Sequence, residues 1–286
     1  MMASPLEHDI VEKLKQTPKY GTLCDETLGR MASWAAARHA SPKEALKAAK
    51  RKLHQACGAY CNAWDLRRVA EIVQALPPNP NADTLRAACQ GILRHHASTR
   101  ERAAILSSIF PLVFEEAGPV TSLLDLACGL GPFMLPWMAP SPTIEYHAVD
   151  IDTRLIGIVN EFLTRLGRPG DARCGDLIVS VPTITADVAL LLKALPCLER
   201  QEKGAGRRVL TQIRARCVVV SFPAQSLGGR AKGMVQHYET YLHGLAAELR
   251  FSVKPYRFRS ETFYMLIRST RSCVRPDGPD QVGFRQ

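Results

Sequence analysis

The chain has no long run of apolar residues. Its longest runs, residues 188–192 and 217–222, fall far short of the roughly 18–20 residues that a membrane span needs. Residues 1–19 are polar and carry charges of both signs, so they lack the apolar core of a secretory signal. We therefore expect a cytoplasmic protein that does not bind a membrane.

The cysteines lack a pattern typical of disulfide or metal sites. There are nine, an odd number scattered along 286 residues, whereas disulfide frameworks occur in small secreted chains. The closest pair, Cys57 and Cys61, is not matched by a second close Cys or His pair that would complete a metal site. We expect reduced thiols packed as small apolar groups, and no bound metal.

Internal repeats and low-complexity tracts are also absent from the sequence. With 46% hydrophobic and 22% charged residues, the composition is that of a globular protein, which excludes a disordered chain, a collagen or a coiled coil. The length allows one large domain or two small ones, and we expect two.

Positive charge is concentrated in the two flanks of the chain. The net charge is +10, with 16 basic and 12 acidic residues over 1–120, 6 and 9 over 121–200, and 12 and 4 over 201–268. Such a field favours a polyanionic partner, and nucleic acid is the leading candidate. A basic enzyme without such a partner would show the same balance.

The first 115 residues are predicted to be helical. Amphipathic patterns predict helices over residues 41–57, 65–76, 83–93 and 98–114. The first of these begins with Ser41 as N-cap, Pro42 in the first turn and Glu44 in the position of a capping box. Gly118-Pro119 marks the expected end of this helical domain.

The predicted helix over residues 41–57 has two distinct faces. One is apolar, while Lys43, Lys47, Lys50 and His54 recur at helical spacing on another. Like charges at this spacing repel one another, so an anionic partner would compensate them, although an ordinary solvated face fits equally well.

From residue 120 the pattern alternates between strands and helices, which predicts a mostly parallel sheet. The strand-like runs are residues 122–127, 145–150, 187–192 and 217–222. Two further runs, 250–258 and 262–268, flank Arg259-Ser260-Glu261 and should pair as an antiparallel hairpin. We expect a helical domain over 1–117, a Rossmann-like α/β domain over 118–270 and a disordered tail over 271–286.

A glycine turn follows the first predicted strand. Residues 123–131, LLDLACGLG, lead a buried strand into a turn where backbone can approach a ligand at the carboxyl edge of the sheet. About twenty residues later Asp150 ends the second strand, where a carboxylate suits the two hydroxyls of a ribose. A dinucleotide and S-adenosylmethionine both fit this arrangement.

Two features favour S-adenosylmethionine. The third glycine of the dinucleotide fingerprint would fall at position 134, which is Met134. The C-terminal hairpin is typical of Rossmann-like methyltransferases, by analogy of fold. A further carboxylate, Asp176, precedes the strand at 187–192, where it meets an adenine amino group or is an ordinary turn residue.

Several separated segments resemble the Arm family of aminoglycoside-resistance 16S ribosomal RNA (guanine-N7) methyltransferases. The resemblance extends from about residue 19 to residue 268, which is nearly the whole chain. A generic methyltransferase would share only the residues 125–129. The segments are SPK (41–43), LH (53–54), CGAY (57–60), HASTRER (96–102), DLACGL (125–130), LKALPCLER (192–200), VSFP (220–223), SLGGR (226–230) and KGM (232–234).

The resemblance implies a set of residues that bind S-adenosylmethionine. Arg102 would hold its carboxylate, although this arginine could equally pair with Glu101 on a helix surface. Gly129 would pass under the methionine part and Asp150 would bind the ribose. The further positions implied near the cofactor are Asp125, Ala127, Asp176 and Leu177 beside the adenine, Lys193 and Gln212.

The resemblance also implies the partner, 16S rRNA within the 30S ribosomal subunit. Guanine N7 is unprotonated near neutral pH, so no catalytic acid or base is expected, and alignment would lower the barrier. The base would be rotated out of its stack. The basic residues implied in RNA binding are Lys19, Lys43, Lys47, Lys50, Arg51, Arg67 and Arg68 in the helical region, with Arg230 and Lys232 near the base.

Three other functions remain open at this stage. A nicotinamide-dependent oxidoreductase would use the same glycine corner. A non-catalytic RNA-binding protein on a methyltransferase fold would bind RNA without cofactor, which the intact turn at 125–129 and Asp150 argue against. An adenine-N1 rRNA methyltransferase is the third, and such enzymes lack the large helical N-terminal region predicted here.

Overall fold

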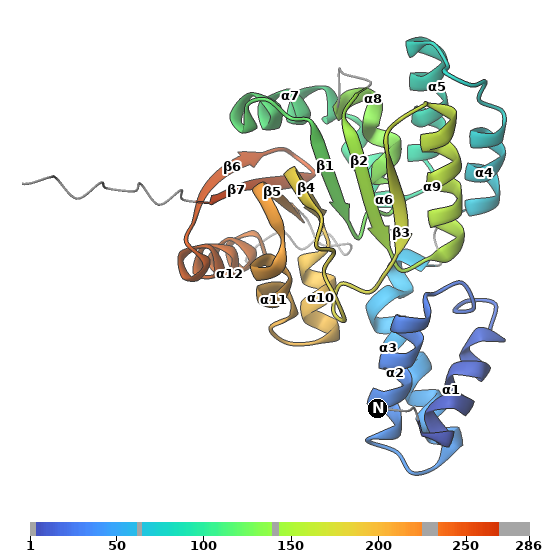
Figure 1. The fold of residues 1–286 in the computed structure, drawn as a ribbon. Coiled ribbons are helices and arrows are strands. Elements are labelled where there is room, and N and C mark those ends of the chain that lie inside the picture. Colours follow the sequence, from blue (N-terminus) through green and yellow to red (C-terminus); the bar gives the residue numbers. More distant parts are fainter. Residues whose placement is uncertain (1–3, 62–64, 139–142, 225–233, 269–286) are drawn as a thin grey trace, which may run out of the picture.

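The computed structural model describes residues 4–61, 65–138, 143–224 and 234–268. Its centre is a seven-stranded sheet in the order β3-β2-β1-β4-β5-β7-β6 (Figure 1). The strands β1 to β5 are parallel, and β7 runs antiparallel to both β5 and β6. The strand bounds are β1 Ser122–Leu126, β2 Glu145–Asp150, β3 Gly170–Cys174, β4 Thr185–Leu192, β5 Arg214–Pro223, β6 Phe251–Arg257 and β7 Glu261–Arg268. The predicted α/β fold with a C-terminal hairpin is confirmed.

Successive side chains of the central strands enter two different cores. Leu123 of β1 packs in one core and Leu124 in the other, and Val218 and Val219 of β5 divide in the same way. Both faces are buried because parallel strands are covered by helices on each side. On one face lie α7 Leu106–Ala117, η1 Gly131–Met134, α8 Leu135–Met138 and α9 Thr153–Arg165, and on the other α10 Leu195–Gln201, α11 Ala205–Gln212 and α12 Met234–Leu249.

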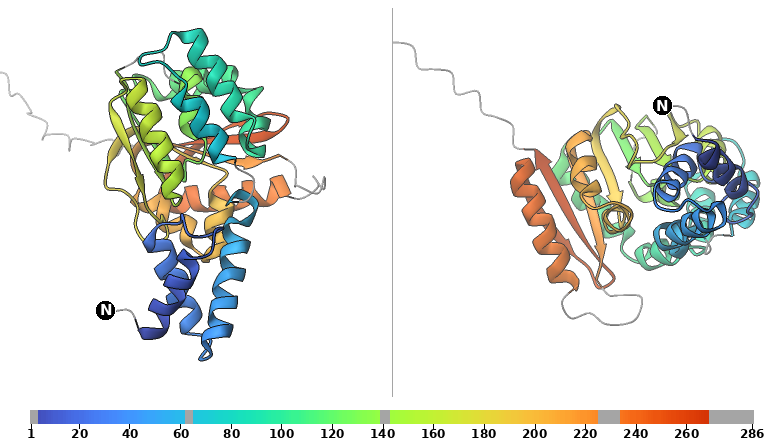
Figure 2. Two further views of the ribbon diagram at one scale, coloured as in Figure 1. Left: turned by 90° about the vertical axis from the view of Figure 1, so that its right-hand side faces the viewer. Right: turned by 90° about the horizontal axis from the view of Figure 1, so that it is seen from below.

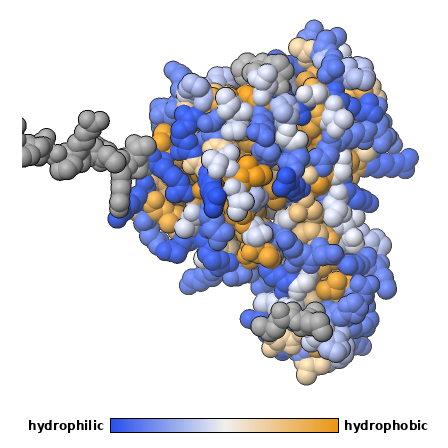
Figure 3. All heavy atoms as spheres, in the orientation of Figure 1, coloured by the Kyte–Doolittle hydropathy of each residue, from blue (hydrophilic) through white to orange (hydrophobic). Residues whose placement is uncertain are grey.

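The N-terminal helices form two groups. Helices α1 Pro5–Lys15, α2 Asp25–Ala36 and α3 Pro42–Cys61 share a core of their own, and we call them the N-terminal bundle. This bundle protrudes below the carboxyl ends of the parallel strands (Figure 2) and has a mostly hydrophilic surface (Figure 3). Viewed from below, it lies under the β2–β3 side of the sheet and leaves the β6–β7 hairpin uncovered.

The other helices of the predicted helical domain pack on the sheet. Helices α4 Leu66–Gln74, α5 Ala82–Leu93 and α6 Ala97–Ala103 precede α7 along the chain. Val73, Ile92 and Phe110 belong to the same core as Leu123 of β1. The hydrophobic cores therefore divide the chain between α3 and α4, and not at the predicted boundary after residue 117, because the apolar faces of α4, α5 and α7 are covered by the sheet domain.

Two local expectations differ from the structure. The helix predicted over 98–114 is interrupted at Ala104 and Ile105, so that Arg102 of α6 faces Glu261 while Ile109 and Phe110 of α7 pack on the sheet. Strand β3 was not predicted, since its five residues, GDARC, lack an apolar run, and it lies at the edge of the sheet beside β2. No helix of the described part of the chain is long and apolar enough to cross a membrane.

Candidate cofactor and active site

A cavity of about 420 Å³ lies between the carboxyl ends of the strands and the N-terminal bundle. Its walls come from the turn after β1, the end of β2, the loop after β3, the end of β4 with helix α10, the start of α4, and helix α6. The N-terminal bundle forms the remaining wall. Its wall residues include Pro18, Lys19, Thr22, Arg30, Ser98, Thr99, Arg102, Ala127, Gly129, Asp150, Asp176, Leu177, Lys193, Ala194 and Gln201.

The turn after β1 is held tightly against β2. The Gly129 N–H donates to Asp150 Oδ2 at 2.9 Å, and the Cys128 N–H donates to the Val149 carbonyl at 3.0 Å. Gly129 has a positive φ of 51°, which glycine adopts at little cost, whereas Ala127 holds the same region at 52° as a non-glycine residue. Such strain at the floor of a cavity is typical of a functional turn.

Asp125 lies beneath this turn and supports it. Its Oδ2 accepts a hydrogen bond of 2.6 Å from the Tyr146 hydroxyl. A Cβ on Gly131 would stand 2.1 Å from the same oxygen, so only glycine fits there. Burial raises the pKa of Asp125 to about 7. Asp125 was predicted to bind the cofactor, but the structure places it behind the turn and outside the cavity wall.

Asp150 lines the cavity at the end of β2. Besides the bond from Gly129, its Oδ1 accepts from the Asp152 N–H at 3.3 Å. Burial raises the pKa of this carboxyl, and the hydrogen bonds from backbone N–H groups oppose that rise. The carboxylate is thus oriented by the backbone at the position predicted for a ribose-binding residue.

Asp176 is almost fully buried, and its carboxylate is hydrogen-bonded to two residues of helix α2. Its Oδ2 accepts from Thr27 Oγ1 at 2.9 Å and from the Nε and Nη2 atoms of Arg30 at 2.9 and 2.7 Å. Its Oδ1 accepts from the Ile178 N–H at 2.9 Å. Neither Thr27 nor Arg30 was predicted to be near the site, because both lie about 150 residues before Asp176 in the chain.

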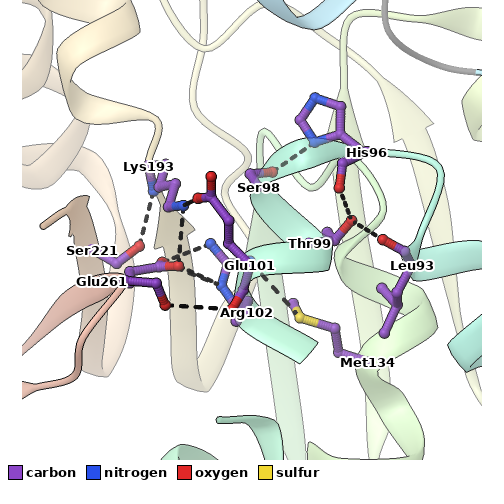
Figure 4. Close-up of polar contacts among 11 residues, drawn as sticks. Leu93, His96, Ser98, Thr99, Glu101, Arg102, Met134, Lys193, Ser221 and Glu261 are labelled. Carbon is purple, nitrogen blue, oxygen red and sulfur yellow. Dashed lines mark hydrogen bonds and ion pairs between the residues drawn. The ribbon is translucent and has the colours of Figure 1, made fainter. Parts of the chain in front are cut away.

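Four charged side chains meet at the wall formed by α6 and the end of β4 (Figure 4). The Nε and Nη2 atoms of Arg102 donate to the buried carboxylate of Glu261 at 2.7–3.2 Å. Lys193 Nζ stands 3.3 Å from Glu261 and 3.1 Å from Glu101. Glu261 therefore pairs with both Arg102 and Lys193, and Lys193 also pairs with Glu101. Sequence reasoning placed Glu261 in a hairpin turn, and no local pattern marks it as part of a site.

Lys193 combines a strained backbone with a buried side chain. Its φ is +57°, and its N–H donates to the carbonyl and hydroxyl oxygens of Ser221 on the neighbouring strand. The bonds to Ser221 hold the left-handed conformation at the end of β4, which directs the ammonium group toward Glu261.

His96 is a further wall residue that sequence reasoning did not select. Burial, together with the positive charges of Arg102 and Lys193, lowers its pKa to about 4. The imidazole is therefore neutral at neutral pH. Its Nδ1 lies 2.6 Å from the Ser98 hydroxyl, which fixes the ring beside the charged cluster (Figure 4).

Gln212 is the one predicted cofactor residue that lies at the opposite edge of the sheet. It ends α11, immediately before the amino end of β5, in a polar recess with Arg214 and Arg268. The reason is topological, since a helix that returns to start a parallel strand carries its last turn away from the carboxyl edge. Ala127, Gly129, Leu177 and Lys193 do line the cavity, together with Arg102, Asp150 and Asp176.

The predicted RNA-binding residues are divided between two groups of helices. Lys43, Lys47 and Arg51 are exposed on α3 and Lys50 is half-buried there, while Lys19 lines the cavity and lies 2.8 Å from His54 Nδ1. Arg67 and Arg68 are exposed on α4, where both pair with Glu71. Arg230 and Lys232 lie outside the described residues, as does the predicted tail at 271–286.

The described residues include no group of three or more His, Cys, Asp or Glu side chains that could hold a metal ion. The cavity is instead lined by the carboxylates of Asp150, Asp152 and Asp176 and by five cationic side chains, which suits an organic ligand with hydroxyl, amino and carboxylate groups. The cations are Lys19, Arg30, Arg102, Arg154 and Lys193.

Comparison with known proteins identifies the family. The family model described as "Ribosomal RNA methyltransferase (FmrO)" matches residues 16–265. The chain belongs to this family of ribosomal RNA methyltransferases. Membership confirms the predicted enzyme class and disfavours a nicotinamide-dependent oxidoreductase.

Several known proteins are similar to almost the whole chain. A 16S rRNA (guanine(1405)-N(7))-methyltransferase of Micromonospora echinospora is 35% identical over 277 residues, covering 93% of this chain and 99% of the relative. An enzyme of the same name from Serratia marcescens is 32% identical and covers 92% and 98%. The crystal structure of RmtF in complex with S-adenosyl-L-homocysteine superimposes with a TM-score of 0.79 at 30% identity, covering 94% of this chain and 100% of that one.

Proposed function

We propose that this enzyme transfers a methyl group from S-adenosylmethionine to N7 of guanine 1405 in 16S rRNA, within the 30S ribosomal subunit in the cytoplasm. The methylated guanine would give resistance to aminoglycosides. The observation on which this proposal rests is the cavity at the glycine corner. Two relatives named for this activity match 93% and 92% of the chain.

The residues of the cavity fit the cofactor group by group. Asp150 can accept from the ribose hydroxyls, and Gly129, which donates to it, lines the cavity where the methionine part would lie. Arg102 Nη1 faces only a weak acceptor, the Sδ of Met134 at 3.8 Å, so it retains donors for a carboxylate. Among the described residues, Asp176 Oδ1 accepts one hydrogen bond, from the Ile178 N–H, and keeps a lone pair for an adenine amino group, with Leu177 beside it.

The chemistry requires positioning and no proton transfer. When bound, S-adenosylmethionine supplies a sulfonium methyl, which the N7 lone pair can attack in line while the C–S electron pair returns to sulfur. Arg102 and Asp150 would hold the donor in the attacking geometry, which is the main source of rate enhancement in such a step. The neutral His96 would add no positive charge beside a guanine that becomes cationic.

Access to the target base is the difficult step. N7 faces the deep, narrow major groove of an A-form helix, so the nucleotide must be rotated out at a cost of a few kcal/mol. We propose that Lys43, Lys47 and Arg51 on α3 contact phosphates and dock the bundle on the ribosome. Lys19, Lys50, Arg67 and Arg68 are proposed as further contacts, and Arg230 and Lys232 as contacts near the flipped base.

The decisive test maps the modified nucleotide. The enzyme is expressed in a susceptible bacterium, and its 16S rRNA is treated with borohydride and aniline, which cleave at 7-methylguanine. We expect cleavage at guanine 1405, lost with Asp150→Ala and with Arg102→Ala, and retained with Lys254→Gln, a surface substitution on β6. Cleavage at another site, full activity of either cavity variant, or methylation of an adenine N1 instead would contradict the proposal.

A further inference from the structure

The N-terminal bundle is fastened to the same loops that line the cavity. The Cys24 N–H at the start of α2 donates to the Ile151 carbonyl at 2.8 Å, and the Thr153 N–H donates to the Thr22 carbonyl at 2.8 Å. Leu23 and Asp152 form an antiparallel bridge between them. The segment before α2 thus pairs with the backbone just after β2, next to Asp150.

The tightest polar contact across this joint is the ion pair between Arg30 and Asp176. The side chains are only 17% and 4% exposed, and the shortest N–O distance is 2.7 Å. Arg30 Nη2 also donates to Gln201 Oε1 at 2.7 Å, at the end of α10. One guanidinium of the bundle therefore ties together two cavity walls, the loop after β3 and helix α10.

The two oxygens of the Asp176 carboxylate have different hydrogen-bond partners. Its Oδ2 takes all three bonds from Thr27 and Arg30, which is more than two lone pairs can accept with ideal geometry. Among the described residues, its Oδ1 takes one bond, from Ile178, and so retains an acceptor site, and Asp176 lines the cavity. The bundle therefore determines in which direction the free lone pair of Asp176 points.

We propose that Arg30 is a positioning residue that couples the N-terminal bundle to cofactor binding through Asp176. The inference rests on the proposed function, in which Asp176 binds the adenine amino group. When Arg30 is paired with Asp176, Oδ1 of Asp176 is oriented to accept from the adenine amino group. A bound adenine in turn stabilises the position of the bundle in which this ion pair forms. Because coupling of binding free energies is reciprocal, the cofactor also raises the affinity of the bundle for the ribosome.

Calorimetric titration with S-adenosylhomocysteine measures the first half of this coupling. We expect Arg30→Gln to weaken binding about tenfold, and Arg30→Lys, which keeps the charge but not the fork, about threefold. In an Asp176→Asn background, Arg30→Gln should add less than about twofold, because the two residues act as a unit. Arg38→Gln, an exposed substitution in the turn just after the end of α2, should leave the affinity unchanged.

Binding to 30S subunits with and without saturating S-adenosylhomocysteine measures the second half. The wild-type protein should bind subunits about fivefold more tightly with the ligand, and Arg30→Gln should reduce this ratio to about one. Thr27→Val, which removes one donor to Oδ2 while keeping its shape, should give an intermediate ratio and serves if Arg30→Gln does not fold.

Two outcomes would overturn the inference. One is an Arg30→Gln or Thr27→Val protein with a lowered melting temperature but wild-type affinity for S-adenosylhomocysteine, which would make Arg30 a structural anchor only. The other is additive losses in the Arg30 and Asp176 double-variant cycle. If instead the wild-type protein fails to bind S-adenosylhomocysteine, the proposed function itself fails, so the two failures are distinguishable.

Discussion

Arg102 and Glu261 lie 159 residues apart in the sequence and form a forked ion pair with an N–O distance of 2.7 Å. Their side chains are 4% and 0% exposed. Because a second cation, Lys193, stands 3.3 Å from the same carboxylate, Glu261 neutralises the charges that would otherwise repel each other at the cavity wall. The last strand of the sheet thereby stabilises a site that is otherwise built at the ends of the first strands.

Replacing Glu261 by glutamine should therefore be costly. The substitution leaves Arg102 and Lys193 buried without their shared carboxylate, and we expect a loss of about 3–5 kcal/mol in the free energy of unfolding. Chemical denaturation of the purified protein measures it. Glu116→Gln, which removes the partner of Lys254 in an exposed pair, is the matched control and should change little. Equal stability of the two variants would disprove this role.

Gly131 should not tolerate a side chain. A Cβ there would meet Asp125 Oδ2 at 2.1 Å, so Gly131→Ala must shift either the turn or the buried carboxylate. We expect lower thermal stability and weaker binding of S-adenosylhomocysteine. Gly157→Ala in helix α9, where nothing lies within 4 Å of the added carbon, should instead stabilise by about 0.5–1 kcal/mol. A well-bound ligand in Gly131→Ala would show that the turn is not part of the site.

The buried carboxyl of Asp125 should make stability depend on pH. Its pKa is about 7 when folded, above the ordinary value of 3.8. The folded state then holds a proton that the unfolded state has released, so the contribution of Asp125 to stability falls as the pH rises from about 4 to about 7. Asp125→Asn removes this titration. We expect the variant to gain stability relative to wild type as the pH rises from about 4 to about 7, measured by denaturant midpoints, and a constant difference would refute the assignment.

Substitutions on the basic face of α3 should weaken binding to the ribosome without changing the binding of the cofactor. Lys43→Gln with Lys47→Gln removes two exposed charges from the bundle, and neither side chain lines the cavity. We expect weaker binding to 30S subunits and a salt dependence reduced by about one unit of slope for each lost phosphate contact. The affinity for S-adenosylhomocysteine should not change. Lys13→Gln on α1, which removes a pair with Asp9, is the control, and an equal loss there would argue against a specific face.

Local signals in the sequence predicted the elements whose patterns are strong. Helix α3 begins at Pro42, directly after Ser41, whose carbonyl accepts from the Ala45 N–H at 2.9 Å. Strand β2 has the predicted bounds, and the hairpin β6–β7 lies where two strand-like runs flank a short turn. These features depend on residues close together in the chain, through capping, apolar periodicity and turn preference.

The sequence by itself determined the α/β fold, the glycine corner beside Asp150 and the resemblance to rRNA methyltransferases. Only the tertiary structure decided which distant side chains complete and support the cavity, since no local pattern marks Arg30 or Glu261 as part of a site. It also showed that Asp125 lies behind the turn and that Gln212 lies at the opposite edge of the sheet. The physical reason is that the pairing of buried charges depends on how helices and strands pack across long separations, and periodicity along the chain carries no information about that.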